Sequence, residues 1–298
     1  MQYLIGIDIG ATNTRVAVVD SMGKIIATTR FPSEMSAGES FFQKVGEAAA
    51  KLASEYQAIA VGVGSAGQID RKTGSYLPGL YPTAPWVGVP LREIIATTTT
   101  LPTFVDNDCK ISAYAELKIG QGQGVADFVS LTLGTGLGGG IISNGQLVHG
   151  ISGVAGHVGH LSLDHSGPQC ACGNRGCLEL YVSGTAVAKQ GSLVFQEELT
   201  SPQLFQRASE GDTRALQILH EVGTALGQGL GAMANLLNPQ LFILGGSILE
   251  WYPFLESSVQ ASFRATAMNG LQDTPIKRSQ LGGEGGIIGA ALYAWDQL

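Results

Sequence analysis

The chain has 298 residues, of which 44% are hydrophobic and 14% are charged, and its formal net charge is −7. This length can bury one large core or two moderate ones. The acidic balance argues against a nucleic-acid or membrane-surface partner and favours action on a small molecule. The N-terminal stretch MQYLIGIDIG has no positive segment before a long apolar run, so no signal peptide is predicted. No stretch is apolar for long enough to span a membrane, and a cytoplasmic location is expected.

Two β-branched runs near the N-terminus, Tyr3–Ile9 and residues 14–19, predict neighbouring strands. The stretch DIGATNT at residues 8–14 joins them. Backbone N–H groups and hydroxyls in such a turn can surround phosphates, with the Asp8 carboxylate beside the accompanying Mg²⁺. The candidates for phosphate contacts are Gly10, Thr12 and Asn13. Taken alone, the motif is explained equally well by an ordinary hairpin turn.

Helical periodicity over Glu39–Tyr56 precedes a predicted strand at residues 58–63, and the glycine-rich loop GSAGQ follows at 64–68. Loops at the carboxyl ends of strands in an open α/β sheet commonly face a ligand, which makes Gly67 and Gln68 candidates. A plain turn is an equal alternative. Residues 76–90 predict an irregular loop, and a helix begins at residue 91.

The stretch FVDND at residues 104–108 predicts a strand that runs into polar residues, and an amphipathic helix follows at 110–118. Asp106 and Asp108 share a face by strand alternation, but only Asp108 lies beyond the strand, at the junction with the helix. An acid at this position can be a catalytic group or simply a helix cap. The residues alone leave both interpretations open.

Five glycines occupy seven positions at residues 134–140, directly after a predicted strand at Phe128–Leu133. They allow close backbone approach to an anion, and a strand rather than a helix follows. The loop is therefore neither a dinucleotide-binding fingerprint nor, without a lysine, a Walker loop. We predict phosphate contacts by Gly134, Thr135, Gly136 and Gly138.

The rest of the chain predicts helices at 181–190, 201–210 and Thr213–Leu237. A buried strand at 240–244 then ends in Gly245 and Gly246. A last glycine cluster at 282–286 leads into an apolar helix at 287–295.

The most specific chemistry lies at residues 153–179. Cys170, Cys172 and Cys177 fall within eight residues of one another, and His160 precedes them. Three sulfurs and one imidazole form the ligand set of a closed tetrahedral structural Zn²⁺ site. The alternatives are a disulfide, which a reducing cytoplasm disfavours, and chance clustering.

The zinc loop, together with V-x-N-D at 105–108 and A-x-A-E at 113–116, resembles the ROK family ("repressor, open reading frame, kinase") of sugar kinases and sugar-responsive repressors. The resemblance covers essentially the whole chain and implies that Asp108 is the catalytic base. It implies sugar contacts by Gly67, Gln68, Asn107, Asp108, His157, His160 and Glu179. It implies phosphate or nucleotide contacts by Asp8, Gly10, Thr12, Asn13, Gly134, Thr135, Gly136, Gly138, Gly245 and Gly246.

The fold class expected is α/β, with two domains around a central cleft, and the resemblance implies the actin-like ATPase (ribonuclease H-like) fold. We predict an N-terminal domain at 1–119, closed by the C-terminal helix at 287–298. The second domain would cover 120–286 and carry the zinc loop at 157–179. The resemblance also implies a homodimer.

The reaction implied is phosphoryl transfer from ATP, with Mg²⁺, to the 6-hydroxyl of a hexose. Glucose-using members of the family usually carry Glu three residues before the zinc histidine, where this chain has His157. Histidine there resembles N-acetylmannosamine kinases, so glucose and N-acetylmannosamine remain near-equal candidates. ATP is the donor expected, and the sequence alone does not distinguish it from polyphosphate. A DNA-binding repressor is disfavoured because the first phosphate turn begins so early in the chain. A sugar-binding protein without kinase activity is the remaining alternative.

Overall fold

The structure is a computed structural model that describes residues 2–79 and 82–298. Leu80 and Tyr81, in the predicted irregular loop, lie outside the described residues. The chain divides into two compact units. The first comprises Met1–Ala126, Gly140–Gly156 and Gln280–Leu298, and the second comprises Asp127–Gly139 and His157–Ser279. These units place residues 120–126, Gly140–Gly156 and residues 280–286 with the N-terminal part, whereas the predicted division assigned them to the second domain.

The sheet of the first unit has the strand order β3-β2-β1-β4-β5. Strands β1, β2 and β3 form an antiparallel meander, whereas β4 and β5 run parallel to β1. The bounds are β1 Tyr3–Ile9, β2 Asn13–Asp20, β3 Ile25–Pro32, β4 Val61–Ser65 and β5 Thr103–Asn107. The predicted strand at 58–63 thus begins and ends later, because Gly64 and Ser65 continue the pairing with β5.

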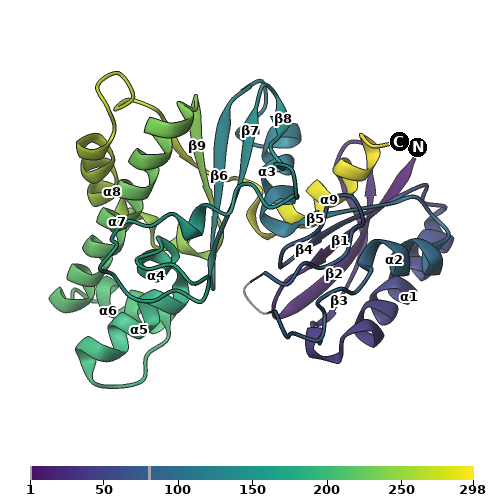
Figure 1. Ribbon diagram of the computed structural model, residues 1–298, viewed down its shortest axis with the longest axis horizontal. Helices are drawn as coiled ribbons and strands as arrows, with labels where there is room; N and C mark the ends of the chain where they lie inside the picture. Colours follow the sequence, from purple (N-terminus) through teal and green to yellow (C-terminus); the bar gives the residue numbers. More distant parts are fainter. Residues whose placement is uncertain (1, 80–81) are drawn as a thin grey trace. The chain divides into compact units, whose positions relative to one another are not determined.

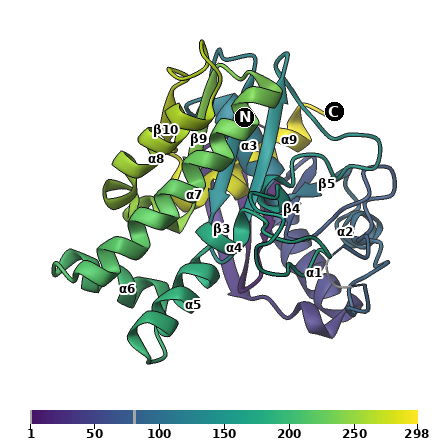
Figure 2. The same ribbon diagram turned by 60° about the vertical axis from the view of Figure 1, so that its left-hand side comes forward.

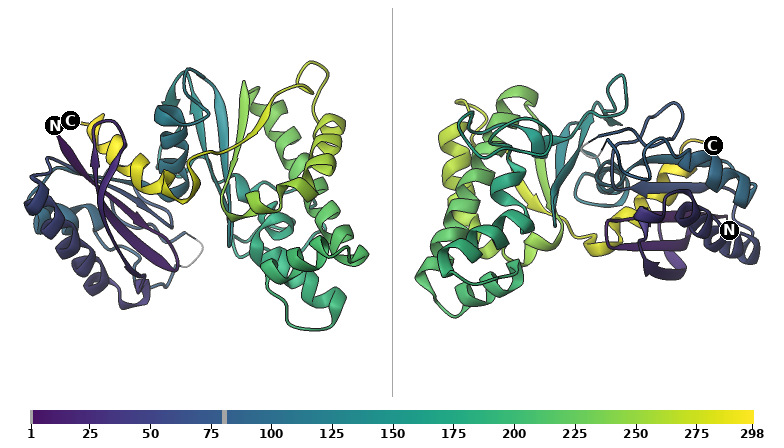
Figure 3. Two further views of the ribbon diagram at one scale, coloured as in Figure 1. Left: turned by 180° about the vertical axis from the view of Figure 1, so that it is seen from behind. Right: turned by 60° about the horizontal axis from the view of Figure 1, so that its bottom comes forward.

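Helices cover both faces of this sheet (Figure 1). One face packs on α1 (Glu39–Tyr56) and α2 (Leu91–Thr99), and the other on α3 (Asp108–Ile119) and α9 (Gly285–Trp295). Side-chain alternation along β1 makes this possible, since Ile5 and Ile7 enter the first core and Leu4 enters the second. Figure 3 shows α9 beside α3 when the chain is viewed from behind.

Small residues let α9 approach the sheet closely. A Cβ on Gly62 of β4 would lie 1.7 Å from the Ala290 carbonyl oxygen, which is far inside any real contact. A larger side chain at this position would push α9 off the sheet.

The second sheet has the order β10-β9-β6-β7-β8, and the division between the units falls within β7. Strands β6 and β9 are parallel, whereas β7 and β8 are antiparallel. The bounds are β6 Phe128–Leu133, β7 Leu137–Ser143, β8 Gln146–Leu147, β9 Leu241–Gly245 and β10 Ile276–Arg278.

The helices of the second unit include the long α7 (Thr213–Leu237), which packs along α8 (Tyr252–Thr266), as Figure 2 shows. The others are α4 Glu179–Val182, α5 Gly184–Phe195 and α6 Ser201–Ser209. Short 3₁₀ turns lie at Met35–Ala37, Val158–His160, Ser247–Glu250 and Gly282–Glu284.

The elements that were not predicted include α8 and β10. The sequence of α8, YPFLESSVQASFRAT, has serines and aromatic residues of modest helix propensity. Its packing on α7 supplies the stability that propensity does not. Across residues 2–79 and 82–298, no helix combines the length and apolar content needed to cross a bilayer.

Candidate active site

The junction between β5 and α3 carries the predicted base. Asn107 is the last residue of β5 and the N-cap of α3, and its side-chain oxygen accepts hydrogen bonds from the N–H groups of Cys109 (3.1 Å) and Lys110 (3.3 Å). The cap interpretation offered for Asp108 therefore applies to Asn107, and Asp108 is the first residue of the helix. This leaves the Asp108 carboxylate available for another role.

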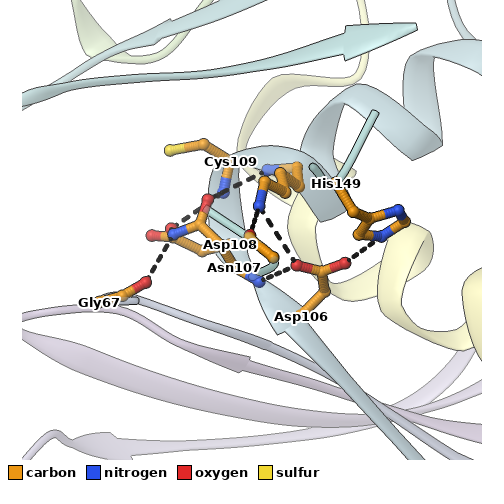
Figure 4. Close-up of polar contacts among 8 residues, drawn as sticks. Gly67, Asp106, Asn107, Asp108, Cys109 and His149 are labelled. Atoms are coloured by element: carbon orange, nitrogen blue, oxygen red, sulfur yellow. Dashed lines mark hydrogen bonds and ion pairs between the residues drawn. The ribbon is translucent and has the colours of Figure 1, made fainter. Parts of the chain in front are cut away.

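The amide of Asn107 is fully engaged within the chain. Its nitrogen donates to the carbonyl oxygen of Gly67 (3.0 Å) and to Oδ1 of Asp108 (2.8 Å), as Figure 4 shows. With the two bonds that its oxygen accepts, all four hydrogen-bonding positions of the amide are used. In this structure Asn107 orients Asp108 and the Gly67 loop, and the sugar contact that the resemblance implies for Asn107 stays a prediction.

The Asp108 carboxylate is held by one of its two oxygens. Oδ1 accepts hydrogen bonds from the Asn107 amide (2.8 Å) and the Cys109 N–H (2.9 Å). Burial and, second to it, the charge of Asp8 raise the pKa of Asp108 to about 6, against the lowering effect of its hydrogen bonds. A carboxylate of this pKa is ionised at neutral pH and is more basic than an ordinary one, which suits a general base.

Asp106, which sequence alternation paired with Asp108, serves a different purpose. Its side chain is buried and its Oδ2 lies 2.6 Å from Nε2 of His149, while Oδ1 lies 3.9 Å from Nζ of Lys110 (Figure 4). Neither His149 nor Lys110 was predicted to belong to the site. No local motif marks the pair, since His149 and Asp106 are 43 residues apart in sequence.

The loop after β4 lies against this junction. Besides the Gly67 carbonyl bond to Asn107, the buried Ser65 hydroxyl is hydrogen-bonded to the hydroxyl of Tyr76. Gly67 has φ +107°, a conformation that favours glycine. The Gln68 carbonyl accepts a hydrogen bond from the Leu77 N–H (2.8 Å). The Gln68 residue is partly exposed. Gly67 is thus held close to Asn107, and Gln68 follows it in the same loop.

The predicted first phosphate segment is a tight turn between β1 and β2, closed by a hydrogen bond from the Gly10 N–H to the Asn13 carbonyl (3.1 Å). Thr12, at its tip, is exposed. Asp8 lies at the base of this turn and pairs with Arg15 at 2.6 Å, and Arg15 also donates to the carbonyl of Gly283. Arg15 was not identified from sequence. It places a positive charge beside the carboxylate expected near Mg²⁺.

In the second unit, the glycine-rich loop at 134–137 is supported from three sides. The Gly134 N–H donates to the Gly136 carbonyl, and the Gly134 carbonyl accepts from the Gly184 N–H at the start of α5 (2.8 Å). Thr185 Oγ1 donates to the Thr135 carbonyl (2.9 Å). Such a preformed loop, with β7 following it, keeps its backbone close to any bound anion.

Glu179 belongs to this loop's surroundings. Its Oε2 accepts from the Leu137 N–H (2.8 Å), and a Cβ on Gly136 would lie 2.6 Å from the same oxygen. Only glycine fits at residue 136 without displacing the carboxylate.

The loop at Gly245 and Gly246 follows β9, the parallel neighbour of β6, so it leaves the sheet at the same end as the glycine-rich loop. Gly246 has φ +91° and lies against the carbonyl of Leu133. Gly138 continues into β7.

The four predicted zinc ligands converge. One donor atom from each of His160, Cys170, Cys172 and Cys177 lies within 4.8 Å of every other. Sulfurs bound at about 2.3 Å in a tetrahedron are separated by about 3.8 Å. The Cys172 and Cys177 sulfurs are 3.5 Å apart, Cys170 Sγ is 3.7 Å from His160 Nδ1, and all four cysteines of the chain are free thiols. The donor set and its spacing fit Zn²⁺ and do not form a disulfide.

His157 precedes the 3₁₀ turn that carries His160, and the two imidazole rings lie 6.4 Å apart. Since Nδ1 of His160 faces the sulfurs, its Nε2 is the ring nitrogen that points elsewhere. The metal loop thus carries His157, His160 and, two residues after the last cysteine ligand, Glu179.

A sequence profile of the ROK family matches residues 4–297. The chain belongs to the ROK family. It is 33% identical to a glucokinase of Thermotoga maritima, over 99% of this chain and 98% of that protein. It is also 30% identical to an N-acetylmannosamine kinase of Yersinia pestis, over 99% of both chains.

A crystal structure of a ROK family glucokinase from Streptomyces griseus, in complex with glucose and AMPPNP, superposes with a TM-score of 0.85 and 32% identity over 99% of each chain. The predicted α/β class and actin-like ATPase fold are confirmed by this similarity to ROK sugar kinases and by the two mixed sheets.

Proposed function

We propose that this ROK protein is an ATP-dependent hexose kinase that phosphorylates the 6-hydroxyl. The observation that carries the proposal is the environment of Asp108. One oxygen of this half-buried carboxylate is fixed by Asn107 and Cys109, and burial raises its pKa to about 6. A fixed carboxylate with raised basicity is suited to accept the proton of an attacking hydroxyl.

In the mechanism proposed, Oδ2 of Asp108 accepts the proton as the sugar oxygen attacks the γ-phosphorus in line, and ADP leaves. Phosphoryl transfer asks the protein for positioning and charge neutralisation rather than covalent chemistry. Mg²⁺ bound with ATP would neutralise charge on the β- and γ-phosphates, and Asp8 is the carboxylate that we place beside it. The backbone of the turn at residues 10–13 and of the loop at 134–138 would hold the phosphates, with Gly245 and Gly246 on the nucleoside side.

The sugar contacts that we propose are those implied by the family resemblance: Gly67, Gln68, Asn107, Asp108, His157, His160 and Glu179. The four-ligand metal site would keep the last three on one stiff loop, with Nδ1 of His160 on Zn²⁺ and Nε2 free to meet a hydroxyl. Asn107 also acts by fixing Asp108.

The pH dependence of turnover follows from the pKa of Asp108. The base must be ionised, so kcat/KM for the sugar is expected to decrease as the pH is lowered below about 6, in inverse proportion to the proton concentration. An ordinary aspartate, with a pKa of 3.8, would keep full activity to well below pH 5. A rate profile measured from pH 4.5 to 8.5 checks this, and a profile that stays flat down to pH 5 contradicts the assignment.

The substrate is proposed to be glucose or N-acetylmannosamine, and His157 is the residue expected to select between them. A neutral imidazole offers one acceptor and one donor, whereas a carboxylate accepts from two hydroxyls. His157→Glu should therefore shift the ratio of kcat/KM for glucose to that for N-acetylmannosamine toward glucose, by on the order of ten-fold for one hydrogen bond. An unchanged ratio would mean that selection lies elsewhere.

The proposal is tested by a coupled ADP-release assay with zinc-replete protein, Mg-ATP and five sugars: glucose, N-acetylmannosamine, N-acetylglucosamine, mannose and fructose. Faster turnover with N-acetylmannosamine than with glucose would assign an amino-sugar kinase, and the reverse order a glucokinase. Polyphosphate in place of ATP tests the donor. Sugar binding by calorimetry without turnover on any sugar would overturn the kinase proposal and favour a sugar-binding regulator.

Two expectations remain, on location and on oligomeric state. The free thiols of the metal loop are kept available in a reducing compartment, consistent with the cytoplasmic location that we propose. The homodimer implied by the family stays a prediction, and light scattering coupled to size exclusion measures it.

A further inference from the structure

A cluster of buried charged groups lies behind the proposed base, on the opposite side of Asn107. The carboxylate of Asp106 is almost fully buried, with His149 and Lys110 as its partners. Burial lowers the pKa of Lys110, and the charge of Asp106 opposes that shift. Charged groups persist in such surroundings only when they are paired and hydrogen-bonded, so these three side chains hold one another in place.

The cluster fastens a turn that is distant in sequence. The Ala155 N–H donates to the His149 carbonyl (3.0 Å), which closes the turn at residues 149–155, and Lys110 Nζ donates to the carbonyl of Gly153. Gly153 has φ +88°, and a Cβ there would lie 2.8 Å from the Ile69 carbonyl oxygen. The turn is thus attached both to α3 through Lys110 and to the segment that follows the Gly67 loop.

A continuous chain of hydrogen bonds connects this turn to the base. His149 Nε2 bonds Oδ2 of Asp106 (2.6 Å), and Oδ1 of Asp106 accepts from the Asn107 N–H (2.7 Å). The Asn107 amide in turn donates to Oδ1 of Asp108 (2.8 Å). Since the Asp106 carboxylate accepts at Oδ2, Nε2 is the protonated nitrogen of His149. Each bond restricts the rotation of the next group.

We propose that Asp106, Lys110 and His149 are positioning residues for the reaction: they set the orientation of the Asp108 carboxylate through Asn107, and they tie the β5–α3 junction to the turn at 149–155. The inference rests on the proposed kinase function. The three residues do not touch the substrates in this role. Their effect is on the geometry of the base and on the turn that ends two residues before His157.

Replacing His149 by leucine leaves Oδ2 of Asp106 buried without its donor. The carboxylate is then free to turn toward Lys110, which releases the Asn107 N–H and loosens Asp108. His149→Leu is expected to lower kcat/KM for the sugar by on the order of 10²-fold, the effect of a misplacement of about 1 Å at a reacting group. The KM for ATP is expected to remain unchanged, because none of the three residues contacts the predicted phosphate segments.

His149→Gln is the conservative variant that separates positioning from mere bulk. The side-chain nitrogen of glutamine sits at the same number of bonds from Cα as Nε2 of histidine, so it can donate to Asp106. We expect this variant to recover most of the activity that His149→Leu loses. Asp106→Asn, which leaves Lys110 buried without a charge partner, is expected to behave like His149→Leu or worse.

A control at the other end of α3 tests whether any loosening of that helix suffices. Lys118 pairs with Asp296 at 2.6 Å, and Tyr114 donates to the same carboxylate. Asp296→Asn should lower the unfolding temperature while leaving kcat and both KM values unchanged at a temperature well below unfolding.

Kinetics with the sugar that supports turnover, together with thermal unfolding, are measured for the wild type and all four variants. Loss of kcat/KM in His149→Leu with recovery in His149→Gln supports the inference. The inference is overturned by wild-type kinetics in His149→Leu, or by losses in all variants, including Asp296→Asn, that simply follow the unfolding temperature. A wild type without activity on any sugar contradicts the proposed function instead, so the two failures are distinguishable.

Discussion

Asp108→Asn is expected to bind the sugar with near-normal affinity and to lose on the order of 10²–10⁴-fold in kcat. Asparagine has the same shape as aspartate, and its oxygen can keep the two hydrogen bonds that Oδ1 accepts from Asn107 and Cys109. What it lacks is a basic oxygen for the hydroxyl proton. Single-turnover rates at saturating sugar and ATP measure the chemical step, and calorimetry measures sugar affinity. Asp108→Ala, which also removes the hydrogen bonds, should be at least as slow.

The same substitution is expected to stabilise the protein at neutral pH. The pKa of Asp108 is raised from 3.8 to about 6 in the folded protein, so the folded state disfavours the ionised carboxylate. The contribution of Asp108 to the free energy of unfolding of the wild type is therefore most favourable below about pH 3.8, and it decreases as the pH rises to about 6. The difference corresponds to at most about 3 kcal/mol, and solvent at the half-buried carboxyl reduces it. Asp108→Asn should unfold a few degrees higher at pH 7.5, with a gain that shrinks toward pH 4.

This opposition between activity and stability is a sharper test than the loss of rate. Substitution of a residue that only caps a helix or packs in the core lowers the stability of the fold. Removal of a poorly solvated active-site charge is expected to raise it. Near-normal turnover in Asp108→Asn would remove Asp108 as the base. A lower unfolding temperature at pH 7.5 would contradict the raised pKa.

Loss of the metal site is expected to have the second largest effect. Zn²⁺ held by four protein ligands contributes folding free energy directly, and here it would fix the loop with His157, His160 and Glu179. Cys177→Ser should lose the bound zinc, lower the unfolding temperature and reduce kcat/KM for the sugar more than 10²-fold, as expected when positioned groups are released. The glycine-rich loop should also become less well ordered, because Glu179 accepts a hydrogen bond from the Leu137 N–H.

Zinc content, measured by mass spectrometry of the metal, gives a readout that does not depend on activity. We expect one zinc per chain in the wild type and much less in Cys177→Ser. Cys109→Ser is the matched control, because Cys109 lies outside the cluster of four donors and its zinc content should remain at one per chain. Wild-type protein that is fully folded and active without metal would contradict a structural role for this site.

The convergence of His160, Cys170, Cys172 and Cys177 could be anticipated from sequence because these residues are close together in the chain. Three cysteines within eight residues, with glycines between them, restrict the loop so strongly that spacing alone predicts the geometry. Strands β1, β2, β4 and β5 and the glycine-rich loops were likewise evident, since side-chain alternation and glycine clusters are short-range signals. The β5–α3 junction was located correctly for the same reason.

The contacts that connect these segments could not be read from the chain. His149 meets Asp106 only because the segment at Gly140–Gly156 returns to the first unit, which a boundary predicted near residue 119 did not allow. The positioning role of Asn107 was missed for a related reason: nothing in the sequence indicates that the Gly67 carbonyl lies within hydrogen-bonding distance of its amide. Helix α8 was missed because its stability comes from packing on α7 rather than from its own residues.

Asp108 is proposed to remove the proton of a hexose hydroxyl during phosphoryl transfer from ATP. The most direct measurement is the rate of γ-phosphate transfer to the sugar, determined side by side for the wild type and Asp108→Asn with sugar binding confirmed for both. The account predicts rapid formation of hexose phosphate in the wild type and a rate on the order of 10²–10⁴-fold lower in the variant, with comparable sugar affinity. Equal rates in the two proteins, or ATP hydrolysis that does not depend on sugar, would contradict it.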